Sequence, residues 1–161
     1  MCGIVGFASK KADYDKQAVL KEMMDRIAHR GPDGEGSYLD EGVALGHRRL
    51  SIIDLQGGAQ PMYNEDGSMV VIFNGEIYNF QELKAQLEEK GHVFATRSDT
   101  EVLLHGYEEW GKGMLNRLRG MFAFAIWDKK TKTLFCARDH FGIKPLYYYQ
   151  NEGTLLFASE I

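Results

Sequence analysis

The chain opens with Met1-Cys2-Gly3-Ile4-Val5-Gly6-Phe7-Ala8, in which a cysteine precedes a short apolar run. Residues 3–8 predict a buried strand, because a run of this length and composition suits the interior of a sheet. Removal of Met1 would leave Cys2 with a thiol and a free α-amine on one α-carbon. An α-amine titrates near ~7.7–8.0 and a thiol near ~8.5, so the amine is a suitable general base for its own thiol. The stretch predicts a strand that begins at a nucleophile, although alone it also fits a small residue without a catalytic role.

Length and composition indicate one globular domain spanning residues 1–161. The apolar content of 44% suffices for a substantial core, and the net charge of −4 with a pI near 5.7 argues against a nucleic-acid partner. No apolar run approaches the roughly 20 residues of a membrane span, and the start lacks the basic lead of a secretory signal. Two distant cysteines, Cys2 and Cys136, do not form a disulfide framework. We expect a cytoplasmic protein, where reducing conditions keep a thiol available.

The pattern of apolar residues predicts many short strands and two blocks of helix. Helical spacing indicates a helix at residues 15–28, one between a cap at Asn79 and a stop at Gly91, one from a cap at Ser98 through Tyr107, and one at 113–118. Strands are expected at residues 3–8, 36–39, 43–47, 50–53, 69–73, 121–127, 133–137, 146–149 and 155–158, with a loop at 56–63. Most of these strands are joined as hairpins. The sequence therefore predicts an α+β fold with two antiparallel sheets stacked between helices.

The sequence lacks the motifs of several common phosphate-binding, serine-nucleophile and metal sites. No GxGxxG or GxxxxGK[ST] phosphate loop and no GxSxG serine elbow occurs. The five histidines are scattered with no pair on one helical face, so no metal site is expected. A second thiol arrangement pairs Cys136 with His140, but Cys136 lies inside the apolar run 134–137 and is interpreted as a core residue.

Polar residues follow the ends of several predicted strands and could converge on one site. Each also has a structural interpretation when it is taken alone. Asn74-Gly75 is a strong type I′ turn signal, Asp99 fits the first turn of a helix, Arg49 fits a surface charge, and Arg138-Asp139 fits an ion pair.

Taken together, segments spread over the whole chain resemble one family. In order, they are Met1-Cys2-Gly3-Ile4, His29-Arg30-Gly31-Pro32-Asp33, His47-Arg48-Arg49-Leu50-Ser51-Ile52, Gly58-Ala59-Gln60-Pro61, Phe73-Asn74-Gly75-Glu76-Ile77-Tyr78-Asn79, Ser98-Asp99-Thr100-Glu101 and Arg138-Asp139-His140-Phe141-Gly142-Ile143-Lys144-Pro145-Leu146-Tyr147-Tyr148. The chain resembles the glutaminase part of the glutamine-hydrolysing asparagine synthetases, which is a class II glutamine amidotransferase domain. The resemblance implies the αββα sandwich of the N-terminal-nucleophile hydrolases.

The resemblance also implies a role for each candidate site residue. Cys2 would attack the glutamine side-chain amide, while Asn74 and the Gly75 backbone N–H would form the oxyanion hole. Arg49 would bind the substrate α-carboxylate. Asp99 would bind the α-ammonium, and Glu76 would assist it. A site with both charges should reject a protein-bound glutamine, which has neither.

The family's members are longer, so residues 1–161 are expected to be a C-terminally truncated glutaminase domain without its synthetase domain. The implied partners are L-glutamine and the synthetase domain of the parent chain, with a possible homodimer and no nucleic acid or membrane. No cofactor is expected here, because ATP and Mg²⁺ would belong to the missing domain. Two alternatives stay open: a non-catalytic module that senses glutamine or docks a partner, and a hydrolase of another amide.

Overall fold

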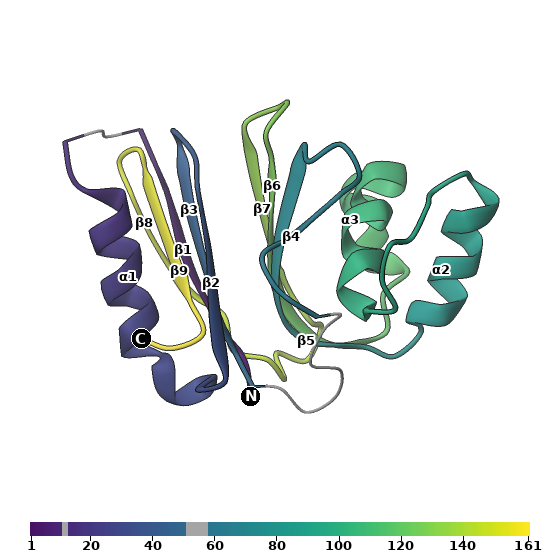
Figure 1. The fold of residues 1–161 in the computed structure, drawn as a ribbon, viewed down its shortest axis with the longest axis horizontal. Coiled ribbons are helices and arrows are strands. Elements are labelled where there is room, and N and C mark those ends of the chain that lie inside the picture. Colours follow the sequence, from purple (N-terminus) through teal and green to yellow (C-terminus); the bar gives the residue numbers. More distant parts are fainter. Residues whose placement is uncertain (11–12, 51–57) are drawn as a thin grey trace.

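The computed structural model describes residues 1–10, 13–50 and 58–161. Two sheets stack face to face, with helices on both outer sides (Figure 1). Helix α1 (Lys16–Arg26) covers the outer face of one sheet. Helices α2 (Phe80–Glu89) and α3 (Asp99–Trp110) lie outside the other sheet, with α3 directly against it. The predicted α+β sandwich of two antiparallel sheets between helices is confirmed.

The first sheet has the strand order β2-β3-β1-β9-β8, and every neighbouring pair in it is antiparallel. Strand β1 lies at its centre, with Gly3 opposite Arg48 of β3 and Val5 opposite Ala158 of β9. The cysteine-led strand is therefore held on both sides. The strands of this sheet are β1 (Gly3–Ser9), β2 (Gly34–Leu39), β3 (Val43–Arg49), β8 (Tyr147–Asn151) and β9 (Thr154–Ala158).

The second sheet has the order β4-β5-β6-β7 and is also antiparallel. Its strands are β4 (Met62–Tyr63), β5 (Met69–Ile77), β6 (Gly120–Asp128) and β7 (Thr133–Arg138). Short 3-10 helices η1 (Ala28–Arg30) and η2 (Gly111–Asn116) connect the layers.

Strand β5 is longer than the sequence predicts, and this lengthening shapes the site. The strand continues through Asn74-Gly75 to Ile77, so the turn interpretation of this dipeptide is wrong. Its pairing with β6 is unbroken, with Asn74 opposite Ala123 and Ile77 opposite Gly120. Long-range pairing with β6 outweighs the local turn preference of Asn-Gly.

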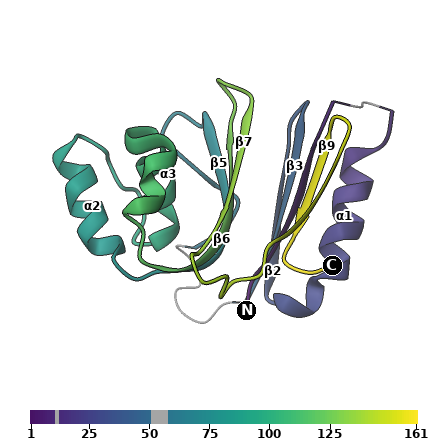
Figure 2. The same ribbon diagram turned by 180° about the vertical axis from the view of Figure 1, so that it is seen from behind.

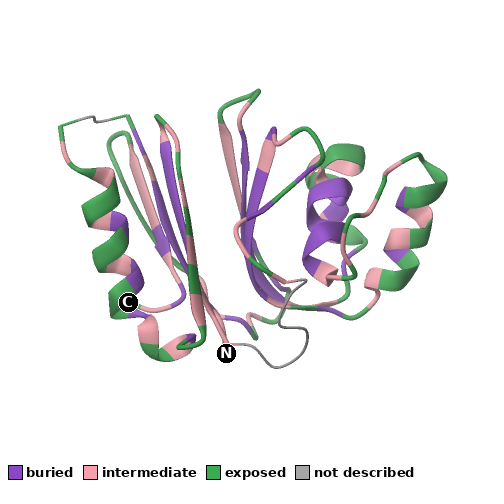
Figure 3. Ribbon diagram, in the orientation of Figure 1, coloured by how far each residue is buried: buried purple, intermediate pink, exposed green. Residues whose placement is uncertain are grey.

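The core has two main layers around the second sheet, which explains its continuous apolar strands. Alternate residues of β5 face opposite sides. Ile72 packs between the sheets with Ile4 and Leu45, whereas Phe73 packs outward against the helix layer with Leu103. Figure 3 shows the corresponding concentration of buried residues on the facing strands and on α3.

Helix α1 packs on the first sheet through a slightly different face from the one expected. Leu20, Met24 and Ile27 are buried against Val5, while Ala18 is exposed. The sequence reading missed Leu20, whose larger apolar area gives it more to gain from burial than Ala18.

Of the other predicted local features, which are helix caps, a short helix and a loop, some are confirmed and some are wrong. Asn79 does not cap α2: its side chain donates to the Arg117 carbonyl and accepts from Arg119 N–H, both at 2.9 Å. Ser98 caps α3 as predicted, accepting from Thr100 N–H at 3.2 Å. The helix predicted at 113–118 is the 3-10 helix η2, and the end of the predicted loop forms β4. Residues 51–53 of the strand predicted at 50–53 lie outside the described residues.

Within the described residues, no helix is both long and apolar enough to cross a membrane.

Candidate functional site

Strands β1 and β5 bring Cys2 and Asn74 to the same end of the two-sheet stack. Ile4 and Ile72 both belong to the core between the sheets. Since side chains alternate along a strand, Cys2 shares the inner face of Ile4, and Asn74 shares that of Ile72. Figures 1 and 2 show the N-terminus and the C-terminal end of β5 at the same end of the stack. The Cys2 thiol and the Asn74 amide therefore face one space.

The Cys2 thiol is half-buried and contacts the backbone just beyond β3. Leu50 N–H donates to Cys2 Sγ at 3.4 Å, and the thiol lies 3.7 Å from the Leu50 carbonyl oxygen. Arg30 Nε also donates to the Cys2 carbonyl at 3.1 Å, so the backbone of Cys2 is held in place. Neither Leu50 nor Arg30 was assigned a role from the sequence, because both contacts span long stretches of chain.

Arg49 ends β3 beside Cys2. Gly3 pairs with Arg48, so Arg49 lies opposite the start of β1. The alternation that places Leu45 between the sheets places Arg49 on the same inner face. A Cβ at position 58 would lie 3.1 Å from Arg49 Nη2, so glycine at that position leaves room for the guanidinium. The described geometry thus gathers Cys2, Arg49 and Asn74.

Asn74 and Gly75 offer hydrogen-bond donors with unusual surroundings. Asn74 is 2% exposed, yet its Nδ2 has no hydrogen-bond partner among the described residues. An unpaired buried donor costs about 1–3 kcal/mol, a cost that a bound acceptor would remove. At Gly75, an added Cβ would lie only 2.2 Å from the Met121 carbonyl oxygen. Only glycine fits this approach of β5 to β6.

Two carboxylates meet at the end of β5. Asp99, the first residue of α3, accepts from Ile77 N–H at 2.8 Å. Burial raises the pKa of Asp99, the Ile77 N–H partly opposes this, and the nearby Glu76 charge raises the pKa further. Glu76 itself is exposed. A cation at this position would relieve the repulsion between the two carboxylates.

Two residues that the sequence reading did not assign position β5 against its neighbours. His47 of β3 is buried and hydrogen-bonds to the Phe73 backbone. Burial lowers the pKa of His47 to about 4, although the Phe73 contact opposes the shift, so the ring is neutral at pH 7. Gln60 Oε1 accepts from Phe73 N–H at 2.6 Å. Both contacts hold the backbone of β5 at the residue before Asn74.

The segment after β7 is organised by Asp139. Its carboxylate accepts four backbone N–H groups at 2.9–3.1 Å, from Phe122, Phe141, Ile143 and Lys144. Burial alone would raise the pKa of Asp139, but these donors lower it. Arg138 donates to the carbonyls of Gly142 and Lys144. Both residues of the pair thus hold the backbone of this loop.

The loop also brings a lysine to the first residue of the chain. Lys144 is buried, and its Nζ lies 3.1 Å from the Met1 thioether.

Cys136 is unsuited to nucleophilic chemistry. It packs against the core between the sheets, and burial raises the pKa of its thiol to about 12. The interpretation of Cys136 as a core residue is confirmed.

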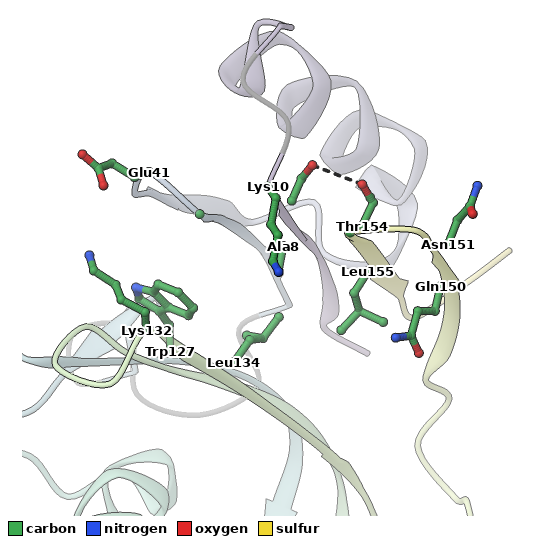
Figure 4. Close-up of a pocket in the computed structure, with 13 residues that line it drawn as sticks. Ala8, Lys10, Glu41, Trp127, Lys132, Leu134, Gln150, Asn151, Thr154 and Leu155 are labelled. Carbon is green, nitrogen blue, oxygen red and sulfur yellow. Dashed lines mark hydrogen bonds between the residues drawn. The ribbon is translucent and has the colours of Figure 1, made fainter.

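A cavity of about 700 Å³ lies at the opposite end of the stack (Figure 4). Its lining includes Ala8 at the far end of β1, Gly42 in the β2–β3 turn, Trp127 of β6 and Lys132 in the β6–β7 turn. None of the candidate site residues lines it, neither Cys2, Asn74 and Gly75 nor Arg49, Glu76 and Asp99. The cavity is thus separate from the gathered site residues.

Comparison with known proteins matches all of residues 1–161 to the family model described as "Glutamine amidotransferase domain". Among curated relatives, asparagine synthetase [glutamine-hydrolyzing] 2 of Bacillus subtilis (strain 168) is 50% identical over 164 residues, covering 100% of this chain and 22% of its own length. Asparagine synthetase [glutamine-hydrolyzing] 2 of Oryza sativa subsp. japonica is 45% identical over 163 residues, covering 100% of this chain and 27% of its own length. The chain thus spans about a quarter of the length of these relatives.

Solved structures agree on the fold. The glutamine phosphoribosylpyrophosphate amidotransferase of B. subtilis, complexed with ADP and GMP, superposes with a TM-score of 0.79 at 24% identity, over 98% of this chain and 42% of that one. A structure of the allosteric regulatory enzyme of purine biosynthesis also gives a TM-score of 0.79, at 25% identity and with the same coverage. With a family match along its full length, this chain belongs to the glutamine amidotransferase domain family.

Proposed function

We propose that this domain hydrolyses the side-chain amide of free glutamine, with Cys2 as the nucleophile. The observation that carries the proposal is the buried Asn74 amide, whose Nδ2 has no partner within the described residues and which faces the same space as Cys2. A donor held without an acceptor is what an oxyanion hole requires before substrate binds.

The chemistry proceeds in two stages once Met1 has been removed. The Cys2 α-amine takes the thiol proton, and the thiolate attacks the amide carbon of glutamine. Asn74 Nδ2 and the Gly75 N–H stabilise the tetrahedral oxyanion, and the amine returns the proton to the departing ammonia. Water then cleaves the glutamyl thioester, which releases glutamate and restores the thiol. No metal or organic cofactor enters these steps.

Substrate selection rests on charges at the two ends of the amino acid. The Arg49 guanidinium matches the α-carboxylate, and Asp99 with Glu76 matches the α-ammonium. The Coulombic effect of Glu76 on Asp99 supports this assignment, because it indicates negative potential at the end of β5. A blocked glutamine should be excluded, since it would leave these groups without their partners.

In a longer protein like these relatives, the ammonia would serve the synthesis of asparagine, as the names of the relatives suggest. Residues 1–161 would form part of its glutaminase domain. ATP and Mg²⁺ would bind the synthetase domain, which would also be the partner of this domain. We further propose a cytoplasmic location and a possible homodimer.

A diazoketone analogue of glutamine tests the proposal directly. Intact mass spectrometry should show loss of Met1 and one covalent adduct, which peptide mapping places on Cys2. Cys2→Ser should remove the adduct, while Cys136→Ser, the matched control, should keep it. Chain that retains Met1 should not hydrolyse glutamine. A mature, folded chain without an adduct would instead favour the non-catalytic sensing or docking module.

Comparison of glutamine with N-acetylglutamine distinguishes a glutaminase from a hydrolase of other amides. Glutamine should be the far better substrate. Equal turnover of the two would contradict the roles proposed for Arg49 and Asp99.

A further inference from the structure

A cluster of imidazoles and carboxylates forms on the helix layer, away from the glutaminase residues. Its members come from three segments: Glu65 after β4, His92 after α2, and His105 with Glu108 on α3. One donor atom from each of Glu65, His92 and His105 lies within 4.8 Å of the others. Sequence spacing alone predicts no metal site, because the ligands are brought together only by the packing of α2 and α3.

The distances within the cluster match those between ligands of a small tetrahedral metal ion. His105 Nδ1 lies 3.1 Å from Glu108 Oε2 and 3.7 Å from Glu65 Oε1. His92 Nδ1 lies 3.6 Å from the same oxygen of Glu108. Zinc–ligand bonds of about 2.0–2.2 Å place tetrahedral ligand atoms about 3.3–3.6 Å apart. These three pairs of donor atoms therefore already stand near the required spacing, and the donor atoms of Glu65, His92 and His105 all lie within 4.8 Å of one another.

Outer carboxylates orient both imidazoles. His105 is 1% exposed, and its Nε2 has no hydrogen-bond partner within the described residues but lies 3.5 Å from Glu101 Oε1. The Glu101 carboxylate is fixed by the N–H groups of Ala95 and Thr96, each at 2.7 Å. Metal-bound histidines commonly direct their second nitrogen at such a carboxylate.

The same arrangement recurs on the other ligands. His92 Nε2 lies 3.4 Å from Glu109 Oε2, and Lys90 Nζ holds Glu109 at 2.9 Å. The free oxygen of Glu108 accepts from Asn64 Nδ2 at 2.6 Å. Each of these ligands thus has a second contact that fixes its orientation.

We propose that Glu65, His92, His105 and Glu108 bind one zinc ion. Imidazole and carboxylate together suit zinc better than Mg²⁺, which prefers oxygen ligands alone. The ion would join the β4–β5 turn, the segment after α2 and helix α3. His105 and Glu108 follow Asp99 by roughly 9 and 14 Å along the axis of α3, so the role is structural and does not depend on the proposed glutaminase.

Zinc titration of chelator-treated protein by isothermal calorimetry tests the site. Cys2 is first blocked with iodoacetamide so that its thiol cannot bind zinc. We expect one zinc ion per chain and a higher thermal midpoint in its presence. Millimolar Mg²⁺ should not compete.

Two ligand variants separate a metal site from a simple ion-pair network. His92→Gln and Glu65→Gln should each weaken zinc binding at least tenfold and abolish the thermal shift. His140→Gln, at an exposed histidine, should bind as the native chain does. The Glu65 side chain is 49% exposed, so its variant should fold even if the His92 variant does not. Absence of binding to the native chain, or equal binding to a folded Glu65→Gln chain, would overturn the proposal.

Discussion

Individual residues of the candidate site lower the stability of the folded domain when no substrate is bound. The Asn74 amide is buried without a partner among the described residues, and the buried Asp99 faces the charge of Glu76. Because these groups are already in position, they can gain their partners when substrate binds without rearrangement of the site. Substitution of Asn74 and of Asp99 tests these two features.

Asn74→Ala should lower kcat for glutamine hydrolysis by about 10²–10³, because one oxyanion donor is lost. Stability should change little, since relief of the cost of the unpaired donor offsets the packing lost when a buried side chain is truncated. Steady-state kinetics and urea unfolding measure the two effects. Asn151→Ala, at the exposed last residue of β8, is the control and should retain full activity. Normal kcat in the Asn74 variant would argue against its role.

Asp99→Asn should reduce kcat/KM for glutamine by about 10²–10³, since truncating one partner of a buried charge pair costs about 2–5 kcal/mol. The amide oxygen can still accept from Ile77 N–H, so the start of α3 should persist. Relative activity on N-acetylglutamine, which has no α-ammonium, should rise in the variant. An unchanged preference for glutamine would exclude Asp99 from substrate binding.

Among the elements, β5 does the most to build the site, and it is the one that sequence reading described least well. Residues 69–73 were predicted correctly because their apolar run is local. Asn74-Gly75 resembles a hairpin turn locally, but pairing with β6 extends the strand through it. The Ser98 cap was predictable because Ser98 bonds to Thr100, close to it in the sequence. The contacts of Asn79 were not predictable, because its partners Arg117 and Arg119 are distant in the sequence.

Gly75→Ala should destabilise the domain by about 1–3 kcal/mol or more, because its Cβ would lie 2.2 Å from the Met121 carbonyl oxygen. Urea denaturation followed by circular dichroism measures the loss. Gly113→Ala is the control, since an added Cβ there meets nothing within 4 Å. Equal stability of the two variants would show that β5 and β6 separate easily at this point.

For the whole molecule, His47 is a buried link between the two sheets. It lies on β3 and hydrogen-bonds to the Phe73 backbone on β5. The site needs this stacking, because Cys2 belongs to one sheet and Asn74 to the other. The sequence could identify both residues through the family resemblance. It could not reveal how the sheets are held, nor the grouping of His92 with His105, since both depend on tertiary packing.

The pKa of His47 predicts how stability responds to acid. Its folded value is about 4 and its ordinary value is 6.5, so the unfolded chain binds more protons between these limits. The free energy of unfolding should therefore fall as pH drops from 6.5 to 4, by on the order of 3 kcal/mol from this group. Below the folded pKa this contribution becomes constant.

Comparison of urea unfolding at pH 7 and pH 4.5 should detect that slope. His47→Gln should lose most of the contribution, whereas His140→Gln, at an exposed site, should keep it. Identical pH profiles for the native and His47→Gln chains would rule out the buried imidazole as the acid-sensitive group.

The contact between Met1 and Lys144 provides a chemical assay for the removal of Met1. The Met1 thioether lies against the Nζ of an otherwise buried lysine, so excision of the first residue would uncover an amine. Chains that have lost Met1 should therefore be acylated faster at Lys144 than chains that retain it. Brief labelling with an amine-reactive ester would then report the fraction of molecules from which the first residue has been removed.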